Sequence, residues 1–165
     1  MAPSGRELIE VASGAEREEW LSLLALADEP APLRESLHEG RLYGLRDADG
    51  APLAVVLAID RDAEVAELRV VAVAEPVQGT GVGTLLVNTV LFVLGGRGIR
   101  RVVVGTASSG VRQLAFYQRL GFRLSHVERD YFVPARGYPA DLSENGIPSR
   151  DMVWMDRDLA ATSPA

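Results

Sequence analysis

The sequence predicts a single α/β domain with a mixed β-sheet and helices on both of its faces. Three observations support this prediction. Strand-like runs of apolar and β-branched residues follow one another in the first half of the chain, the strongest over residues 63–74. Two helical segments, 82–96 and 109–122, come later and alternate with further strands. The chain has 165 residues, enough for one ordinary domain, which we place at 1–165 with its core at about 6–159.

The N-terminal part predicts a strand, two helices and a hairpin. Residues 7–12 alternate as a first strand, and Ser13 is placed to cap a helix with a glutamate three residues on. Pro30 and a second proline break the chain before a short helix over 33–40. Residues 41–60 read as two strands joined by the turn Asp-Ala-Asp-Gly.

The strand over 63–74 carries charged residues within an apolar run. Because side chains alternate along a strand, one face receives Val65, Glu67, Arg69, Val71 and Val73, and the other receives Leu68, Val70 and Ala72. Glu67 and Arg69 then share a face, toward which a substrate cleft could open.

The remaining elements follow the same reading. They are a helix over 82–96, a strand over 100–106, a helix over 109–122, a strand over 122–133, a loop over 134–149 and a strand over 150–159. This order contains seven strands, with no internal repeat and no linker.

Composition excludes several function classes. The net charge of −6 argues against a nucleic-acid partner, although it is compatible with a cationic substrate. The N-terminus lacks the basic start and apolar core of a signal peptide, and the longest apolar run is too short to span a membrane. We therefore expect a cytoplasmic protein without a membrane partner.

Three residue types are absent or rare. The chain has no Cys, which removes disulfides, thiolate metal sites and a Cys nucleophile, and no Lys, which removes Schiff-base chemistry. Only two His occur, so we expect no metal site.

Residues 78–83, Gln-Gly-Thr-Gly-Val-Gly, lie between a strand and the start of a helix. Helix N-termini favour anions, and glycines let a phosphate approach the backbone. A tight turn without any ligand is one interpretation. A dinucleotide-binding turn requires another glycine spacing and an acidic residue after the next strand, and a P-loop requires the missing lysine.

A fourth interpretation rests on two motifs together. The segment "VVAVAEPVQGTGVGTLL" resembles motif A of the GNAT acetyltransferase superfamily, and "QLAFYQRLGFR" resembles its second signature, in the right order and at the right separation. The resemblance covers residues 40–124 well. It implies the GNAT acyl-CoA N-acyltransferase fold, an α/β (α+β) domain with a mixed, mostly antiparallel seven-stranded sheet and helices on both faces.

The resemblance also implies a site for coenzyme A. The glycine turn would hold the pyrophosphate through the backbone amides of Gln78, Gly79, Thr80, Gly81, Val82, Gly83 and Thr84. The preceding strand would splay open and pair with the pantetheine arm through Val71, Ala72 and Val73. The N–H of Val73 would then polarise the thioester carbonyl.

Catalytic roles follow from the same resemblance. Tyr117 matches the tyrosine that protonates the departing thiolate, and Glu67 matches a glutamate that takes the amine proton through water. Glu128 and Asp130 are the alternatives to Glu67. Where many members have an asparagine, this chain has serines, of which Ser108 is placed to contact coenzyme A and Ser108 or Ser109 to cap the next helix.

The function implied is acetyl-CoA-dependent N-acetylation of a primary amine on a small cationic molecule or a peptide. A longer acyl donor is an alternative, as is an acyl-CoA-binding sensor or a degenerate domain without catalysis. A homodimer is possible, because late strands often pair across a dimer in this fold.

Overall fold

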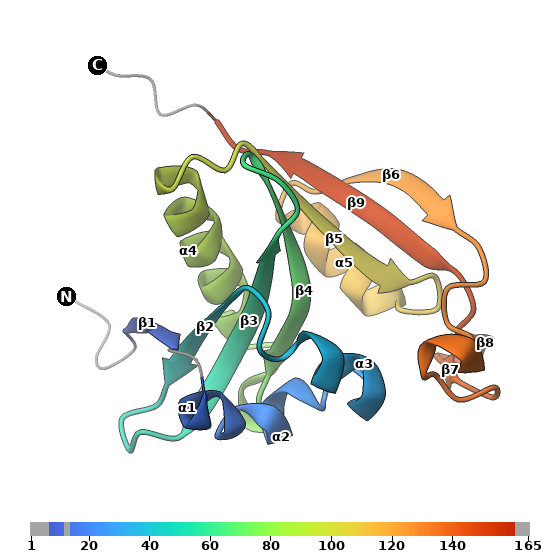
Figure 1. Ribbon diagram of the computed structural model, residues 1–165, viewed down its shortest axis with the longest axis horizontal. Helices are drawn as coiled ribbons and strands as arrows, with labels where there is room; N and C mark the ends of the chain where they lie inside the picture. The colour runs from blue at the N-terminus through green and yellow to red at the C-terminus, as the bar shows by residue number, and fades with distance from the viewer. Residues whose placement is uncertain (1–6, 12–13, 161–165) are drawn as a thin grey trace.

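The computed structural model describes residues 7–11 and 14–160, and its main sheet has seven strands in the order β1-β2-β3-β4-β5-β9-β6 (Figure 1). The pair β4–β5 is parallel, and the other neighbours are antiparallel. This confirms the mixed, mostly antiparallel sheet. The strands are β1 Leu8–Val11, β2 Arg41–Arg46, β3 Pro52–Asp60, β4 Val65–Val73, β5 Arg101–Ala107, β6 Arg123–Glu128 and β9 Met152–Asp158.

Helices cover both faces of the sheet, as predicted (Figure 1). The larger core lies under α4 and α5, where Leu86 and Leu94 of α4 are fully buried. The smaller core lies under α2 and α3 on the opposite face. Burying one such leucine contributes about 1.5–3 kcal/mol. The helices are α1 Ala15–Glu18, α2 Leu21–Leu24, α3 Pro30–Ser36, α4 Val82–Gly96 and α5 Val111–Arg119.

The N-terminal helices differ from the sequence prediction. The first helix is divided into α1 and α2, and Ser13, its predicted cap, lies outside the described residues. The division brings Trp20 into the core, where its ring fills the space above Gly44. The prediction that Pro30 breaks the chain was wrong, because Pro30 begins α3 at a position where the missing N–H costs no hydrogen bond.

Strand β4 contains a bulge at Arg69. Leu57 of β3 pairs with Val70, whereas the next residue, Ala58, pairs with Leu68. A bulge adds one residue and reverses the alternation beyond it. The predicted single face is therefore wrong for Val71 and Val73, whereas Glu67 and Arg69 do share a face and bond to each other at 2.8 Å. Val71 and Val73 pack with Leu68 in the core under α4, while Val70 and Ala72 pack in the core under α2.

The C-terminal part has a shorter strand than predicted and an extra hairpin. β6 ends at Glu128, and Asp130 turns the chain with a φ of 57°. The predicted loop 134–149 contains a short 3₁₀ turn and a small hairpin, β7 Ser143–Glu144 and β8 Ile147–Pro148. Asn145 and Gly146, both with positive φ, form its tight turn.

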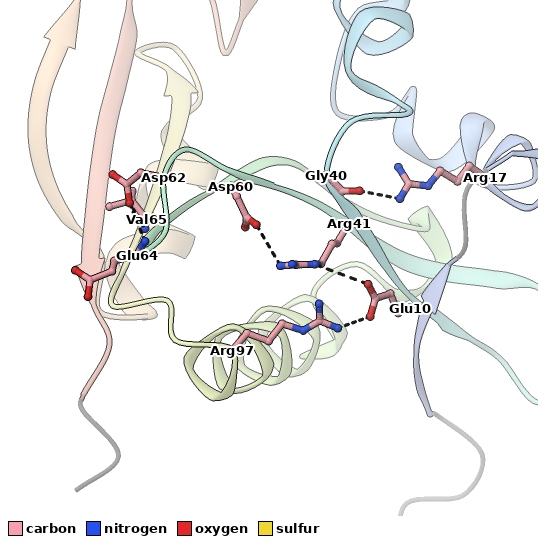
Figure 2. Close-up of polar contacts among 9 residues, drawn as sticks. All are labelled: Glu10, Arg17, Gly40, Arg41, Asp60, Asp62, Glu64, Val65 and Arg97. Carbon is pink, nitrogen blue, oxygen red and sulfur yellow. Dashed lines mark hydrogen bonds and ion pairs between the residues drawn. The ribbon is translucent and has the colours of Figure 1, made fainter.

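Ion pairs join the helix α4 to one edge of the sheet. Figure 2 shows Glu10 of β1 between Arg41 of β2 and Arg97, which follows α4, and Arg41 also reaches Asp60 at 3.4 Å. These side chains are partly exposed, so each pair contributes little by itself. Among the described residues, no helix combines the length and apolar character that a membrane span requires.

Candidate functional site

The strands β4 and β5 diverge in the middle of the sheet (Figure 1). Their pairing ends at Leu68 and Val104, although β4 stays paired with β3 as far as Val73. The N–H of Ala74 donates to Leu53 of the β3 side, so by alternation the N–H groups of Val73 and Val71 point toward the divergence. Ala72 points its N–H toward β3 instead. The divergence therefore has two backbone donors along its β4 side.

The glycine turn follows β4 and leads into α4. Gly79 and Gly81 have φ values of 75° and 89°, which only glycine adopts readily. Gly83 is a glycine for a different reason, since an added Cβ would lie 3.3 Å from Val73 and 3.5 Å from Phe116. Its missing side chain lets the first turn of α4 pack against both β4 and α5. The side chain of Gln78 donates to the carbonyl of Val73 at 3.0 Å and fixes the turn on the strand.

Backbone donors collect at this turn. Within the described residues, no hydrogen-bond acceptor is present for the N–H groups of Gly79, Gly81, Val82, Gly83 and Thr84, and the first helical bond is donated by Leu85. The N-cap residue of α4 is a glycine, so no side chain satisfies these groups. Unpaired N–H groups at the positive end of a helix dipole form an anion site. This structure fits the predicted phosphate cradle.

Tyr117 lies in the core between Phe116 and Phe122, with ring centroids 5.1 and 5.6 Å away. Its side chain is buried, and this burial raises the pKa of the phenol above its usual value of 10. No described residue forms a hydrogen bond with the Tyr117 hydroxyl, and this hydroxyl is not fully enclosed by the protein. A neutral phenol in this position can act as a proton donor.

The serines before α5 do not cap it. The N-cap of α5 is Gly110 and makes no side-chain hydrogen bond. Ser109 is buried and its hydroxyl bonds to that of Ser149 at 2.6 Å, while the N–H of Ser108 donates to Asp151. The predicted serine cap is therefore wrong. Ser108 stays a predicted contact of coenzyme A, since its side chain is not committed to the helix.

A cavity of about 350 Å³, here called the central cavity, opens on the face of the sheet away from α4. Within the described part of the chain, its lining contains three basic and three acidic residues, and its aromatic residues come from three different segments. The charged residues are Arg61, Arg69, Arg136, Glu67, Glu128 and Asp156, and the aromatic ones are His126, Tyr131 and Trp154.

Glu67 is the most buried charged group of the central cavity, with 3 % of its surface exposed. Its Oε2 accepts hydrogen bonds from Arg69 at 2.8 Å and from the Nε of Arg61 at 3.3 Å. A buried carboxylate requires such partners. Arg69 follows Glu67 by two residues on β4, so both side chains lie on the face of the central cavity. Within the described residues, no bond goes to Oε1.

Trp154 forms the floor of the central cavity where β4 and β5 separate. An added Cβ on Gly105, the first β5 residue beyond the pairing with β4, would lie 2.9 Å from the indole, so the ring crosses the strand there. The indole N–H donates to Oε2 of Glu128 at 3.0 Å. Arg61 stacks on the ring at 5.0 Å, and His126 lies parallel to it at 6.3 Å.

The two alternatives to Glu67 separate in the structure. Glu128 lines the central cavity and accepts from Arg136 at 3.3 Å through its other oxygen. Asp130 is exposed on the turn after β6 and pairs with Arg150, and this bond and charge hold the pKa of Asp130 below its usual value. Asp130 does not line the cavity.

A second cavity of about 400 Å³, here called the outer cavity, adjoins the first. The two share Arg69, Tyr131 and Arg136. One wall comes from α3 and the residues around it and carries carboxylates. Asp28 on this wall accepts from the hydroxyl of Tyr138 at 3.3 Å, and burial raises the pKa of both groups. The carboxylates of the outer cavity are Asp28, Glu35 and Glu39.

Sequence reasoning missed Arg61, Tyr131, Arg136 and Trp154 as cavity residues. They come from the β3–β4 turn, the segment after β6 and β9, which are far apart in the chain. The alternation of residues 150–159 did place Trp154 and Asp156 on one face, but nothing in the sequence said which face was hollow. No cluster of His, Asp or Glu suited to a metal ion occurs among the described residues.

Comparisons with known proteins agree with this arrangement. A family model described as "Acetyltransferase (GNAT) family" matches residues 6–122. The uncharacterized N-acetyltransferase YvbK of Bacillus subtilis is 35% identical over 143 residues, which are 86% of this chain and 90% of that protein.

Two solved structures are similar over nearly their full length. A GNAT family acetyltransferase from Elizabethkingia anophelis, with acetyl-CoA bound, is 27% identical, with a TM-score of 0.85 over 95% of this chain and 100% of that one. A Bacillus subtilis acetyltransferase in complex with CoA is 30% identical, with a TM-score of 0.83 over 94% and 99%.

Proposed function

The chain belongs to the GNAT family of acetyltransferases, and we propose that it moves an acetyl group directly from acetyl-CoA to a primary amine of a small cationic molecule or a peptide. The observation that carries this proposal is the glycine turn, where unpaired amides gather at the start of α4 beside the diverging strands. The absence of Cys fits direct transfer, because no thiol is present to carry the acetyl group.

The residues present fit acetyl-CoA, whose thioester carbonyl would be the group attacked by the amine. Its pyrophosphate would be held by the amides from Gln78 to Thr84, of which those from Gly79 onward are mostly unpaired. Val71, Ala72 and Val73 would run along its pantetheine arm. Val71 and Val73 are suited to bond with it, because their N–H groups face the divergence of β4 and β5, and Ser108 would add a contact from the loop before α5.

Two groups would act on the thioester. The N–H of Val73 would donate a hydrogen bond to the carbonyl oxygen, and preorganised donors of this kind are worth about 3 kcal/mol. Tyr117 would donate its proton to the departing sulfur. Its raised pKa keeps the phenol protonated at neutral pH, so the proton is available when the sulfur leaves.

Glu67 would take the proton of the amine, directly or through water. Its Oε2 is occupied by two guanidinium groups, and Oε1 is the oxygen left to accept. Glu128 is the alternative base within the central cavity, although Arg136 and Trp154 engage both of its oxygens. We place Asp130 outside the site, because it pairs with Arg150 on an exposed turn.

An acyl-CoA-binding sensor is the main alternative function. A sensor and an enzyme would both bind the cofactor at the glycine turn, and only the enzyme would release coenzyme A with a free thiol. The cavity supports the enzyme, since a sensor has no use for an acceptor-sized space lined with charged and aromatic side chains next to the diverging strands. A longer acyl donor and a homodimer stay predictions.

Thiol release tests the proposal. The protein is mixed with acetyl-CoA and a panel of amines, and free coenzyme A is followed with a thiol reagent, to which the Cys-free chain adds no background. Amine-dependent release supports the enzyme. Tight acetyl-CoA binding without release for any amine would establish the sensor instead, and propionyl-CoA and butyryl-CoA test the acyl length.

A further inference from the structure

Two of the three described carboxylates that line the central cavity already accept hydrogen bonds from other side chains. Glu67 receives hydrogen bonds from Arg61 and Arg69, and Glu128 receives one from Arg136 and one from the indole of Trp154. Among the described residues, Asp156 is the carboxylate of this cavity that accepts no hydrogen bond. A ligand entering the cavity therefore finds few acceptors that are still available.

Hydrogen-bond donors of the arginines remain without described partners in the central cavity. A guanidinium has five N–H donors. Arg69 uses one nitrogen, bonding to Glu67 at 2.8 Å, and Arg136 uses one, bonding to Glu128 at 3.3 Å. The Nε of Arg69 has no partner at all within the described residues. Arg136 is held in place, because it also stacks on Tyr131 at 4.4 Å.

The charge immediately around Glu67 also favours an anionic ligand. Two guanidinium groups, from Arg61 and Arg69, pair with this single buried carboxylate, so the cluster keeps one positive charge. The charged lining of the whole cavity is balanced, but an anion placed beside these guanidinium groups would be attracted. Arg69 and Arg136 line both cavities, so this bias is centred where the two cavities meet.

We propose that the acceptor carries a carboxylate close to its amine, as an amino acid does, and that Arg69 and Arg136 bind this carboxylate at the junction of the two cavities. The inference rests on the proposed function and narrows its acceptor. Guanidinium groups match a carboxylate in geometry as well as charge.

The position of Arg69 explains why amine and carboxylate would be close together. Arg69 is the bulge residue that directly follows Leu68, the last residue of β4 paired with β5. A carboxylate on Arg69 thus lies beside the divergence of the strands, and an amine a few bonds away lies within reach of it. Glu67 and Asp156 are the nearby carboxylates that would receive the amine's proton or charge.

The outer cavity limits where this anion can sit. Asp28, Glu35 and Glu39 line its wall, so a carboxylate placed deeper in it would be repelled. The anionic group is therefore restricted to the junction. The remainder of the acceptor, which would extend into the outer cavity, is neutral or basic.

Matched acceptors test the proposal. Phenylalanine, its amide and phenethylamine differ in the carboxylate, as do arginine and its amide, and each is compared by kcat/KM in the thiol assay. Because the guanidinium donors lose a charged partner, we expect the amides to react about 10- to 100-fold less well than the acids. A dipeptide series separates a free amino acid from a peptide as the source of the carboxylate.

Variants give a second test. Arg136→Gln should raise KM for the acids about 10-fold or more, with little change for the amides or for acetyl-CoA. Arg69→Gln should show the same rise for the acids together with a lower kcat for acids and amides alike, because Arg69 also bonds to Glu67. Arg101→Gln is the matched control, since Arg101 pairs with Asp158 on an exposed strand end away from both cavities. Arg136 is nearly half exposed, so its variant should fold even if that of Arg69 is destabilised.

Binding can also be read without turnover. The chain has two tryptophans, of which Trp20 is fully buried in the smaller core and Trp154 lines the central cavity. Acids should change the fluorescence of Trp154 in the presence of coenzyme A at lower concentration than amides do, and Trp154→Phe should remove the signal.

These outcomes separate the two proposals. Selective binding of acids without thiol release would overturn the enzymatic function and leave the carboxylate site standing. Amides that react as well as acids, or an Arg136 variant that affects both equally, would overturn the carboxylate site while the acetyltransferase stands.

Discussion

At the scale of residues, the proposed chemistry depends on two side chains held in opposite kinds of environment. Tyr117 lies in an apolar core between aromatic rings, which favours its neutral form. Glu67 lies in a buried polar cluster with Arg61 and Arg69, which supplies partners for its negative charge. Different environments assign different proton-transfer roles, here a proton donor and a proton acceptor.

Replacing Tyr117 with Phe should lower kcat about 100-fold and leave the Kd of acetyl-CoA unchanged, because only the transferred proton is lost. Stopped-flow thiol release and calorimetry measure the two quantities. Tyr43→Phe is the control, since the Tyr43 hydroxyl is buried without a partner on the β2 strand. Wild-type turnover in the Tyr117 variant would remove this residue from the mechanism.

Replacing Glu67 with Gln should lower kcat about 100-fold, because the acceptor of the amine proton is lost while the shape of the side chain is kept. Glu64→Gln provides the control, because Glu64 is exposed and pairs with Arg100 in the turn just before β4. The measurement is kcat from about pH 5 to pH 9. A kcat of the Glu67 variant that equals the wild-type value across this pH range would assign the base to another group, with Glu128 the first to test.

Which residues could be predicted depended on whether their motif is local. Tyr117 and the glycines belong to short continuous motifs, so the sequence located them. The partner Arg61 and the cavity residue Trp154 reach the site from distant strands, and local periodicity carries no information about such contacts.

At the scale of elements, β4 serves both halves of the proposed site. Before the bulge, Glu67 points into the central cavity, and beyond it Val71 and Val73 turn their N–H groups toward the divergence. Strict alternation predicted the wrong face for Val71 and Val73, because the sequence of a valine-rich strand does not reveal a bulge. The glycine turn was predicted correctly, since positive φ at Gly79 and Gly81 requires glycine.

Filling the space at Gly83 should separate α4 from its neighbours. A branched side chain in Gly83→Val would clash with Val73 and Phe116, displacing the first turn of α4 and the amides it carries. We expect acetyl-CoA affinity to fall at least 10-fold by calorimetry. Gly96→Ala at the other end of α4 is the control, because nothing lies within 4 Å of its added Cβ. Unchanged affinity in the Gly83 variant would argue against a cradle at this turn.

At the scale of the whole molecule, tyrosines govern alkaline stability. The chain has no Lys or Cys, and burial raises the pKa of all four tyrosines. Because each pKa is higher in the folded than in the unfolded state, the protonated phenols favour folding. Their contribution to the free energy of unfolding is fully present below the unfolded pKa of about 10, and it is lost as the pH rises through the folded pKa.

The free energy of unfolding in urea should therefore stay level between about pH 8 and pH 9.5 and fall above about pH 10. Tyr117→Phe should reduce the steepness of this fall, since one titrating group is removed. A stability that keeps rising above pH 10 would contradict the burial of these phenols.

The order of the seven strands of the main sheet and of the helices α4 and α5 could be predicted, because hydrophobic periodicity and turn residues are properties of the sequence itself. The division of the first helix into α1 and α2 and the hairpin of β7 and β8 were not predicted. The insertion of β9 between β5 and β6, which gives the central cavity its floor, could not be predicted from periodicity. It is set by long-range packing of Trp154 across Gly105.

The central claim is that the glycine turn holds the pyrophosphate of coenzyme A. A crystal structure of the protein with coenzyme A tests it most directly. We expect phosphate oxygens within hydrogen-bonding distance of the unpaired N–H groups between Gly79 and Thr84, with the sulfur between β4 and β5. Coenzyme A bound elsewhere, with this turn free of phosphate, would contradict the account.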